Sequence, residues 1–183
     1  MADVTTLIQA ANQGSGQAIN QLFEVLYDDL RRLARSRMRR SDALTLLDTT
    51  SLVHESYMRF IKAGELRIND RDHFLAYAAK VMRNIVVDVI RERRAEQRGG
   101  KGIHVTLNTE IAESVPAKEA EVLGVHEALQ SLAAVDERLV QVVELRYFAG
   151  LTEEETARVL GITDRTVRRD WEKAKLLLAA VLR

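Results

Sequence analysis

Apolar side chains recur every three or four residues through most of the first hundred positions, a spacing that predicts amphipathic helices. The pattern predicts helices over residues 4–12 and 17–40, a third from Thr49 or Thr50 to about Lys62, and a fourth over about 74–97. Two adjoining apolar rows run along the fourth helix, so a wide face of it is expected to be buried. Asp72 is its predicted cap, and the AGELRINDRDH segment before it is expected to be a loop.

A second run of helical periodicity begins near residue 121. Residues 99–120 mix glycines, acidic residues and the sole proline, Pro116, and no apolar period persists through them. That composition is typical of a flexible acidic linker. The chain is therefore expected to be all-α, with small helical domains over 1–98 and 121–183 joined by the linker 99–120. Inside the second domain, the pattern predicts a break near Ala134 and Val135 and a helix stop at Gly150.

The last forty residues carry the signals of two short helices joined by a tight turn. Thr152 and Glu155 have the spacing of a capping box, Gly161 provides the turn, and Thr163 is placed to cap the next helix. The buried side of that helix is expected to include Val167, Trp171, Ala174 and Leu178. This pattern favours a helix-turn-helix whose Arg-rich start faces DNA. A pair of packed helices with no role in DNA binding is the alternative.

Composition narrows the class of protein. The 183 residues are 46% hydrophobic and 30% charged, which is typical of a folded domain. The chain has no cysteine, so it has neither a disulfide framework nor a thiolate metal site. It shows no signal region and no window of 18 uncharged apolar residues, so we expect a cytoplasmic protein that does not enter a membrane.

The charges are balanced overall, with 27 basic and 27 acidic residues, but they are unevenly distributed. Six basic and three acidic residues lie between Arg83 and Lys101, and the same numbers lie between Arg158 and Lys175. Between these segments, residues 108–127 hold five acidic residues and one basic residue. This pattern indicates two anion-binding surfaces separated by a segment that avoids them.

Histidine spacing argues against catalysis and against a metal site. His54, His73, His104 and His126 lie in separate segments. His54 and Glu55 begin an HExxH-like pattern, but the second histidine it needs is replaced by Met58. We therefore expect no enzymatic activity, no metal and no cofactor.

Three stretches occur in one chain in a suggestive order: LVHESYMRF at 52–60, FLAYAAKVMRNIVVDVIRERRAEQR at 74–98, and VELRYFAGLTEEETARVLGITDRTVRRDWEKAK at 143–175. They resemble, respectively, the clamp-docking helix, the promoter-melting helix and the C-terminal promoter-binding region of bacterial RNA polymerase sigma factors. Two such units with a short linker look like the compact extracytoplasmic-function (ECF) type. The resemblance covers nearly the whole chain and implies an alternative sigma factor with core RNA polymerase and promoter DNA as partners.

The resemblance also implies roles for individual residues. Those on the clamp-binding helix are Asp48, Leu52, Val53, His54, Glu55, Tyr57 and Arg59. Those facing the non-template strand of the minus-ten element are Tyr77, Lys80, Arg83, Asn84, Asp88 and Arg91. Those at the minus-thirty-five element are Thr163, Arg165, Thr166, Arg168, Arg169 and Lys173.

These roles are chemically reasonable for the minus-ten face. Arginines neutralise phosphates, an asparagine can read a base edge, and Tyr77 offers a stacking surface for an unpaired base. Two alternatives remain open at this stage. Tyr77 can serve partly as a core residue, and Asp88 can simply pair with Arg91 or Lys80 on the helix surface.

The start of the clamp helix departs from the family pattern. Most relatives carry an acidic D-A-E-D cluster there, whereas this chain has Asp48-Thr49-Thr50-Ser51. Losing charged partners at an interface costs on the order of 2–5 kcal/mol, so docking on the polymerase should be weakened. A phosphate on Thr50 would restore about −1.5 to −2 charges at a helix start that favours anions.

The sequence here resembles a subset of these sigma factors, with T-x-L-V-H-E, that is linked to Ser/Thr kinases rather than to anti-sigma proteins. It therefore predicts Thr50 as an activating phosphosite, with Thr49 and Ser51 as second choices and a Ser/Thr kinase as a partner. An anti-sigma factor is possible, but the sequence does not indicate one. The alternative is that these residues only cap the helix, a role worth about 1 kcal/mol, while His54, Glu55 and Arg59 contact the polymerase.

Two rival functions come from other classes. One is a helix-turn-helix regulator that binds duplex DNA without polymerase and uses its first domain for dimerisation or sensing. The other is a structural adaptor whose arginine-rich helices contact RNA or protein. The RNIVVD helix and the tandem order of the two units favour the sigma factor over both.

Overall fold

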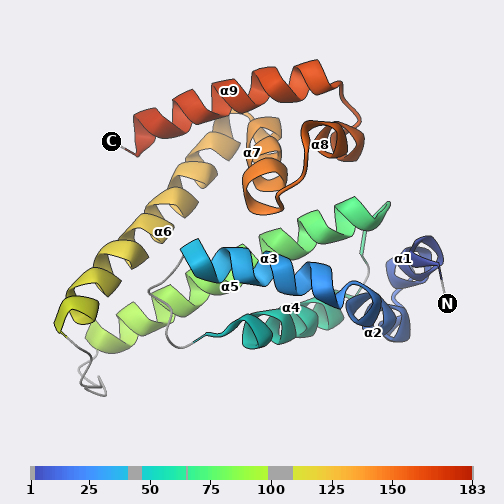
Figure 1. The fold of residues 1–183 in the computed structure, drawn as a ribbon, viewed down its shortest axis with the longest axis horizontal. Coiled ribbons are helices and arrows are strands. Elements are labelled where there is room, and N and C mark those ends of the chain that lie inside the picture. Colours follow the sequence, from blue (N-terminus) through green and yellow to red (C-terminus); the bar gives the residue numbers. More distant parts are fainter. Residues whose placement is uncertain (1–2, 41–46, 65, 99–108, 183) are drawn as a thin grey trace.

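The computed structural model describes residues 3–40, 47–64, 66–98 and 109–182. The described residues form helices and contain no strand, which confirms the all-α prediction. A first unit contains α1 (Val4–Asn12), α2 (Gly16–Val25), α3 (Tyr27–Arg40), α4 (Thr49–Ala63) and α5 (Arg71–Arg98). A second unit contains α6 (Thr109–Val135), α7 (Glu137–Val143), the π-helical turn η1 (Glu144–Phe148), α8 (Glu153–Leu160) and α9 (Asp164–Val181). In Figure 1, α9 lies across α7 and α8, and α6 runs from the end of α5 toward α9.

The core of the first unit is one continuous apolar cluster contributed by α1 to α5. Aromatic rings from three helices meet at its centre. The ring of Phe23 on α2 lies edge-on to those of Tyr57, Phe60 and Phe74, with centroid separations of 5.3, 5.0 and 5.7 Å. Edge-to-face packing of this kind adds to the stabilisation that burial alone provides. It fixes α4 and α5, the two helices of this unit to which the sequence analysis gave binding roles.

Two details of the first unit differ from the sequence predictions. The helix predicted over 17–40 is two helices, because α2 ends at Val25 and Leu26 has a non-helical backbone (φ −99°, ψ 14°). The predicted cap of the fourth helix was also wrong. Asp70 performs that role, since its carboxylate accepts a hydrogen bond of 2.8 Å from the backbone N–H of His73. Asp72 is buried instead and pairs with arginines, as described below.

Helix α6 begins at Thr109, inside the segment expected to be a linker, while residues 99–108 lie outside the described residues. Glu119 shows how this part of α6 is held. Its side chain is 2% exposed and lies 3.2 Å from Arg93 and 3.4 Å from Arg94, both on α5. A buried carboxylate needs such partners. No sustained apolar stripe marked this helix in the sequence, because the charge pairs and only a few apolar side chains, Val122 and Leu123, attach it to the first unit.

The second unit divides its apolar residues among three smaller clusters. As predicted, a break follows Val135: Asp136 caps α7, accepting a hydrogen bond from the N–H of Arg138 at 3.2 Å. The predicted stop at Gly150 is also present, with a φ of +73° that glycine adopts without strain. Of the expected buried side of α9, Val167 and Ala174 are fully buried, and Trp171 and Leu178 are half-buried.

Candidate nucleic-acid interface

The start of α4 has one clear cap. The Asp48 carboxylate accepts a hydrogen bond of 2.8 Å from the backbone N–H of Ser51. That bond is the main reason why the pKa of Asp48 lies below its ordinary value. Thr50 and Ser51 occupy the first helical turn with exposed side chains. The cap therefore belongs to Asp48, and the neighbouring hydroxyls face solvent.

The residues assigned to the polymerase separate into buried and accessible groups. Leu52 and Val53 are 0% and 4% exposed and belong to the core of the first unit. Tyr57 is half-buried, and its hydroxyl donates to Oδ1 of Asn20 at 2.7 Å. His54 and Glu55 are exposed. The part of α4 that another protein can reach thus includes Thr50 and Ser51, the side that carries His54 and Glu55, and Met58 further along.

A groove of about 590 Å³ lies between this part of α4 and the middle of α5. Arg59 lies in it and donates to Asp88 on α5 at 2.9 Å, with Glu55 at 3.6 Å. The partner of Asp88 is therefore on another helix, and neither Arg91 nor Lys80 fills that role. Glu92 lines the groove as well, so acidic side chains outnumber basic ones there.

The residues assigned to the minus-ten element lie along one side of α5. Tyr77, Lys80 and Arg91 are exposed, whereas Asn84 is half-buried. The ring of Tyr77 is 37% exposed and packs edge-on against Phe60 at 4.9 Å. One edge of the Tyr77 ring therefore supports the core, and the remainder stays accessible for the predicted stacking role.

Arg83 differs from its neighbours on α5. Its side chain is only 11% exposed and bonds to Glu144 of η1 and His126 of α6. Neither partner was predicted from the sequence. No local pattern marks them, since 43 and 61 residues separate them from Arg83.

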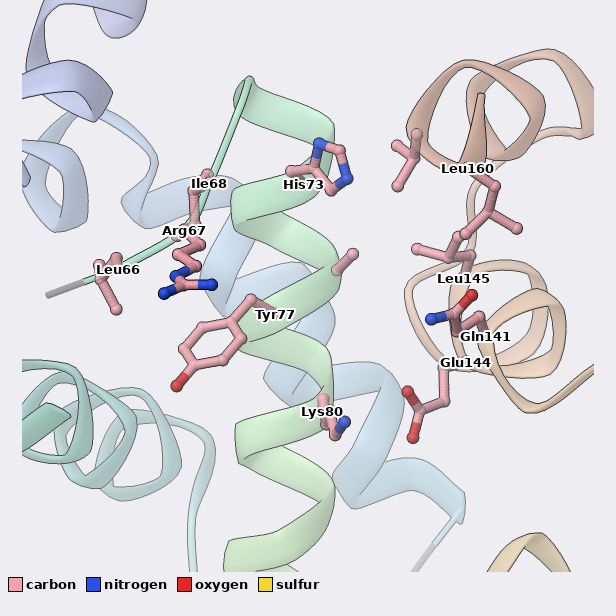
Figure 2. Close-up of a pocket in the computed structure, with 12 residues that line it drawn as sticks. Leu66, Arg67, Ile68, His73, Tyr77, Lys80, Gln141, Glu144, Leu145 and Leu160 are labelled. Atoms are coloured by element: carbon pink, nitrogen blue, oxygen red, sulfur yellow. The ribbon is translucent and has the colours of Figure 1, made fainter. Parts of the chain in front are cut away.

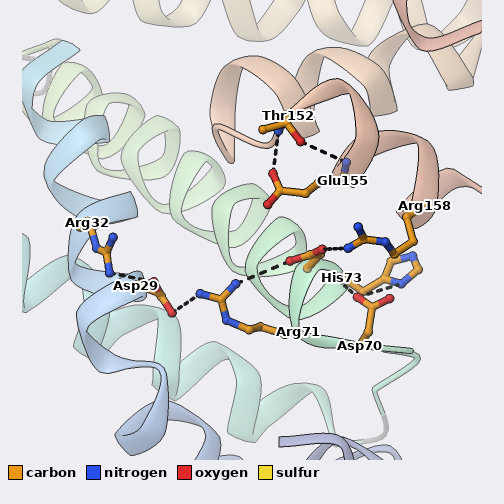
Figure 3. Close-up of polar contacts among 9 residues, drawn as sticks. Asp29, Arg32, Asp70, Arg71, His73, Thr152, Glu155 and Arg158 are labelled. Atoms are coloured by element: carbon orange, nitrogen blue, oxygen red, sulfur yellow. Dashed lines mark hydrogen bonds and ion pairs between the residues drawn. The ribbon is translucent and has the colours of Figure 1, made fainter. Parts of the chain in front are cut away.

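The start of α9 is built by local capping. The predicted capping box is present at α8, where the N–H of Thr152 donates to Glu155 at 2.7 Å and the N–H of Glu155 donates to Thr152 at 3.2 Å (Figure 3). Gly161 then turns the chain with a φ of +65°. Thr163 caps α9, as predicted, by accepting from the N–H of Thr166 at 3.3 Å. Arg165, Arg168, Arg169 and Lys173 are exposed along the helix that follows.

Acidic side chains hold two of these arginines in place. Glu153 accepts from Arg168 at 2.8 Å, which lowers the pKa of Glu153. Asp170 is 2% exposed and accepts from Arg138 at 2.7 Å and from Arg169 at 3.1 Å. Burial raises the pKa of Asp170, but these hydrogen bonds outweigh it and leave the pKa below its ordinary value. The acids orient a row of guanidinium groups toward solvent.

Comparison with known proteins identifies the chain's relatives. Among the described residues, no helix combines the length and apolar character needed to cross a bilayer. No solved structure matches the chain. The ECF RNA polymerase sigma factor BldN of Streptomyces coelicolor is 26% identical over 182 residues, which are 99% of this chain and 66% of that protein's length. The chain thus spans about two thirds of that relative. The family model described as ECF sigma factor matches residues 1–183, so this chain belongs to the ECF sigma factor family.

Proposed function

We propose that this chain is an alternative sigma factor that binds core RNA polymerase in the cytoplasm and directs it to specific promoters. One observation carries the proposal. Basic helix faces on α5 and on α9 occur in tandem, in a chain that matches the ECF sigma factor family from end to end. A regulator that binds duplex DNA alone needs one such face, whereas a factor that both places and melts a promoter needs two.

Each face suits a different form of DNA. The exposed Tyr77 on α5 offers a ring for stacking an unpaired base, beside the cation of Lys80. On α9, Arg165, Arg168 and Arg169 lie within the first two turns of a helix that follows a three-residue turn. That is the geometry of a helix-turn-helix, whose second helix enters the major groove. We therefore assign α5 to the melted minus-ten strand and α9 to the minus-thirty-five duplex.

Docking on the polymerase falls to the exposed start of α4, and Thr50 is the proposed control point. Asp48 already caps the helix, so a phosphate on Thr50 does not compete for that role. The groove beside it holds Glu55, Asp88 and Glu92. These carboxylates repel a phosphate, which directs it outward to where a basic partner surface would meet it.

The experiment is a binding titration of core RNA polymerase with purified unmodified protein, kinase-treated protein or Thr50→Glu, and Thr50→Ala. Ser131→Glu adds the same charge as Thr50→Glu at an exposed position on α6 and serves as the matched control. If only the charged Thr50 forms bind tightly, the result supports both the sigma factor assignment and the phosphorylation switch. Equal tight binding by all versions supports the sigma factor and removes the switch. No binding by any version favours a regulator that acts without polymerase.

A further inference from the structure

Arg83 is the centre of a contact among three helical elements. Its Nη2 donates to Oε1 of Glu144 at 2.5 Å, and its Nη1 bonds to Nδ1 of His126 at 2.9 Å. Its guanidinium carbon lies 5.6 Å from the centre of the Phe148 ring. The group thus links α5 of the first unit to α6 and η1 of the second, and we call these residues the Arg83 clasp.

The clasp defines the protonation state of His126. Arginine has no acceptor, so Nδ1 of His126 must accept, and the ring must be neutral with its proton on Nε2. Burial is the main cause that lowers the pKa of His126, and the charges of Arg83 and Arg91 lower it further. The carboxylate of Glu144, 12% exposed, balances the guanidinium. One cation, one anion and one neutral acceptor therefore form the clasp.

A second polar contact lies nearer the start of α5. Arg158 on α8 donates to Asp72 at 3.1 Å, and Asp72 also lies 3.6 Å from Arg71 (Figure 3). Arg71 in turn bonds to Asp29 on α3. These two contacts lie about three helical turns apart on α5, and they join the second unit to α5 in addition to the pairs of Glu119 with Arg93 and Arg94.

The surface between these two contacts is incompletely packed. Small and medium apolar side chains meet there, with Ala76 of α5 against the cluster of Leu145, Leu151 and Val159. A cavity of about 350 Å³ remains, and Figure 2 shows Tyr77 and Lys80 on one side of it and Gln141 and Glu144 on the other. Arg83 Nε is also buried without a hydrogen-bond partner among the described residues. An interface with a void and an unsatisfied donor is easier to open than a close-packed one.

The clasp and the proposed DNA surface share Arg83. Arg83 was assigned to the minus-ten strand, and both of its Nη groups are already bonded within the protein. Tyr77 and Lys80 line the cavity beside Arg83 and remain exposed. A strand of DNA therefore cannot contact all three while the units are closed.

We propose that the Arg83 clasp is an autoinhibitory latch, which keeps Arg83 from the minus-ten strand until Arg83 exchanges Glu144 and His126 for DNA phosphate. The role of the latch in DNA binding rests on the proposed function, whereas the contacts that form it do not. The latch makes the free protein a poor DNA binder, because only the open fraction of molecules presents the full α5 face.

The test measures opening directly. The chain has no cysteine, so spin labels can be attached specifically at Asn69→Cys and Glu154→Cys, two exposed positions on opposite sides of the interface. Pulsed electron resonance then gives the distribution of distances between them. In Glu144→Ala we expect the population at long distances to rise roughly tenfold. Glu137→Ala, an exposed glutamate on α7, is the matched control and should leave the distribution unchanged.

A charge swap distinguishes loss of the ion pair from misfolding of the variant. The double variant Arg83→Glu, Glu144→Arg rebuilds the ion pair with reversed polarity and should return the distances toward the parent distribution. Unlabelled Glu144→Ala should also bind a single-stranded minus-ten oligonucleotide several-fold more tightly than the parent protein. Parent-like distances in Glu144→Ala would overturn the latch. This readout needs no polymerase, so failure of the sigma assignment shows separately, as loss of core enzyme binding by all versions.

Discussion

The first unit buries one continuous apolar cluster in which Phe23, Phe60 and Phe74 meet, whereas the second divides its apolar residues among three smaller clusters. Polar contacts and backbone geometry supplement these small clusters in the second unit. They are the ion pairs of Asp170, the capping box and the turn at Gly161. The first unit is thus stabilised mainly by area removed from water. The second depends more on the charge and backbone geometry of a few residues.

This difference matches what each unit presents to solvent. A helix that exposes a row of arginines along α9 cannot also bury a wide apolar face, so acids beneath the row must help to fix it. Helix α5 has a wide buried face that fixes it in the core, and acids such as Glu119 and Glu144 engage its arginines in addition. Four substitutions or conditions test the contrast.

The largest effect is expected for Phe60→Ala. Phe60 is fully buried and contacts three aromatic rings, so the cavity should cost about 3–5 kcal/mol of unfolding free energy. Urea denaturation followed by circular dichroism measures it. Met58→Ala, on the exposed side of the same helix, should change stability by less than about 0.5 kcal/mol. Similar losses in both variants would mean that the aromatic cluster has no special weight.

Asp170→Asn should destabilise the second unit by about 2 kcal/mol, because it removes the charge that two arginines bond. Since the folded pKa of Asp170 is lowered, its contribution is present above the ordinary value of 3.8 and is lost as the pH falls through and below it. Fluorescence of Trp171, the sole tryptophan, reports unfolding of this unit. Glu172→Gln, an exposed change on the same helix, is the control. A parent-like acid transition in Asp170→Asn contradicts the assignment.

Gly161→Ala should cost about 1 kcal/mol, because an alanine at a φ of +65° is strained even though the space around it is open. Gly16→Ala provides a matched control, since that glycine also has open space but lacks a positive φ. It begins α2, where alanine is the better helix former. Thermal unfolding of both variants compares them. Equal melting temperatures would show that the turn carries no strain.

The smallest effect is expected from mild acid acting on the Arg83 clasp. The groups that face His126 are Arg83, Arg91 and Asp88 on α5, Glu127 on α6, and Glu144 beyond Arg83. With the pKa of His126 lowered in the closed form, closure is favoured above its ordinary value of 6.5 and weakens as the pH falls below it. The long-distance population should rise roughly a few-fold between pH 7.5 and 5.5. His126→Gln should lose this pH dependence, and retention of it would place the titrating group elsewhere.

The elements that the sequence predicted well are those with local causes. The capping box at Thr152, the cap at Thr163 and the turn at Gly161 depend on residues within three or four positions, so their spacing was sufficient. The break at Leu26 and the helix that holds Glu119 depend on packing between segments far apart in sequence. Which of Asp70 and Asp72 caps α5 also depends on a distant segment, because Arg158, 86 residues away, donates a hydrogen bond to Asp72.

The candidate site followed the same rule. Exposure of Arg165, Arg168 and Arg169 was foreseen from helical spacing, since the apolar side of α9 fixes where its other side points. Burial of Leu52 and Val53 agrees with the apolar stripe of the helix. The resemblance gave both a role in polymerase binding, but in the core their side chains are not accessible to a partner. Engagement of Arg83 by Glu144 could not be foreseen, because no period or motif connects them.

The cap at Asp48 has a consequence for how this helix can evolve. The Asp48 carboxylate accepts a hydrogen bond from a backbone N–H at the start of α4, so the exposed side chain of Thr50 is not needed for the helix to form. Exchange of Thr50 for alanine, serine or glutamate therefore leaves the fold nearly unchanged while it alters the charge shown to a partner. A lineage can add, remove or make permanent a signal at this position in a single codon change, without a compensating mutation elsewhere in the protein.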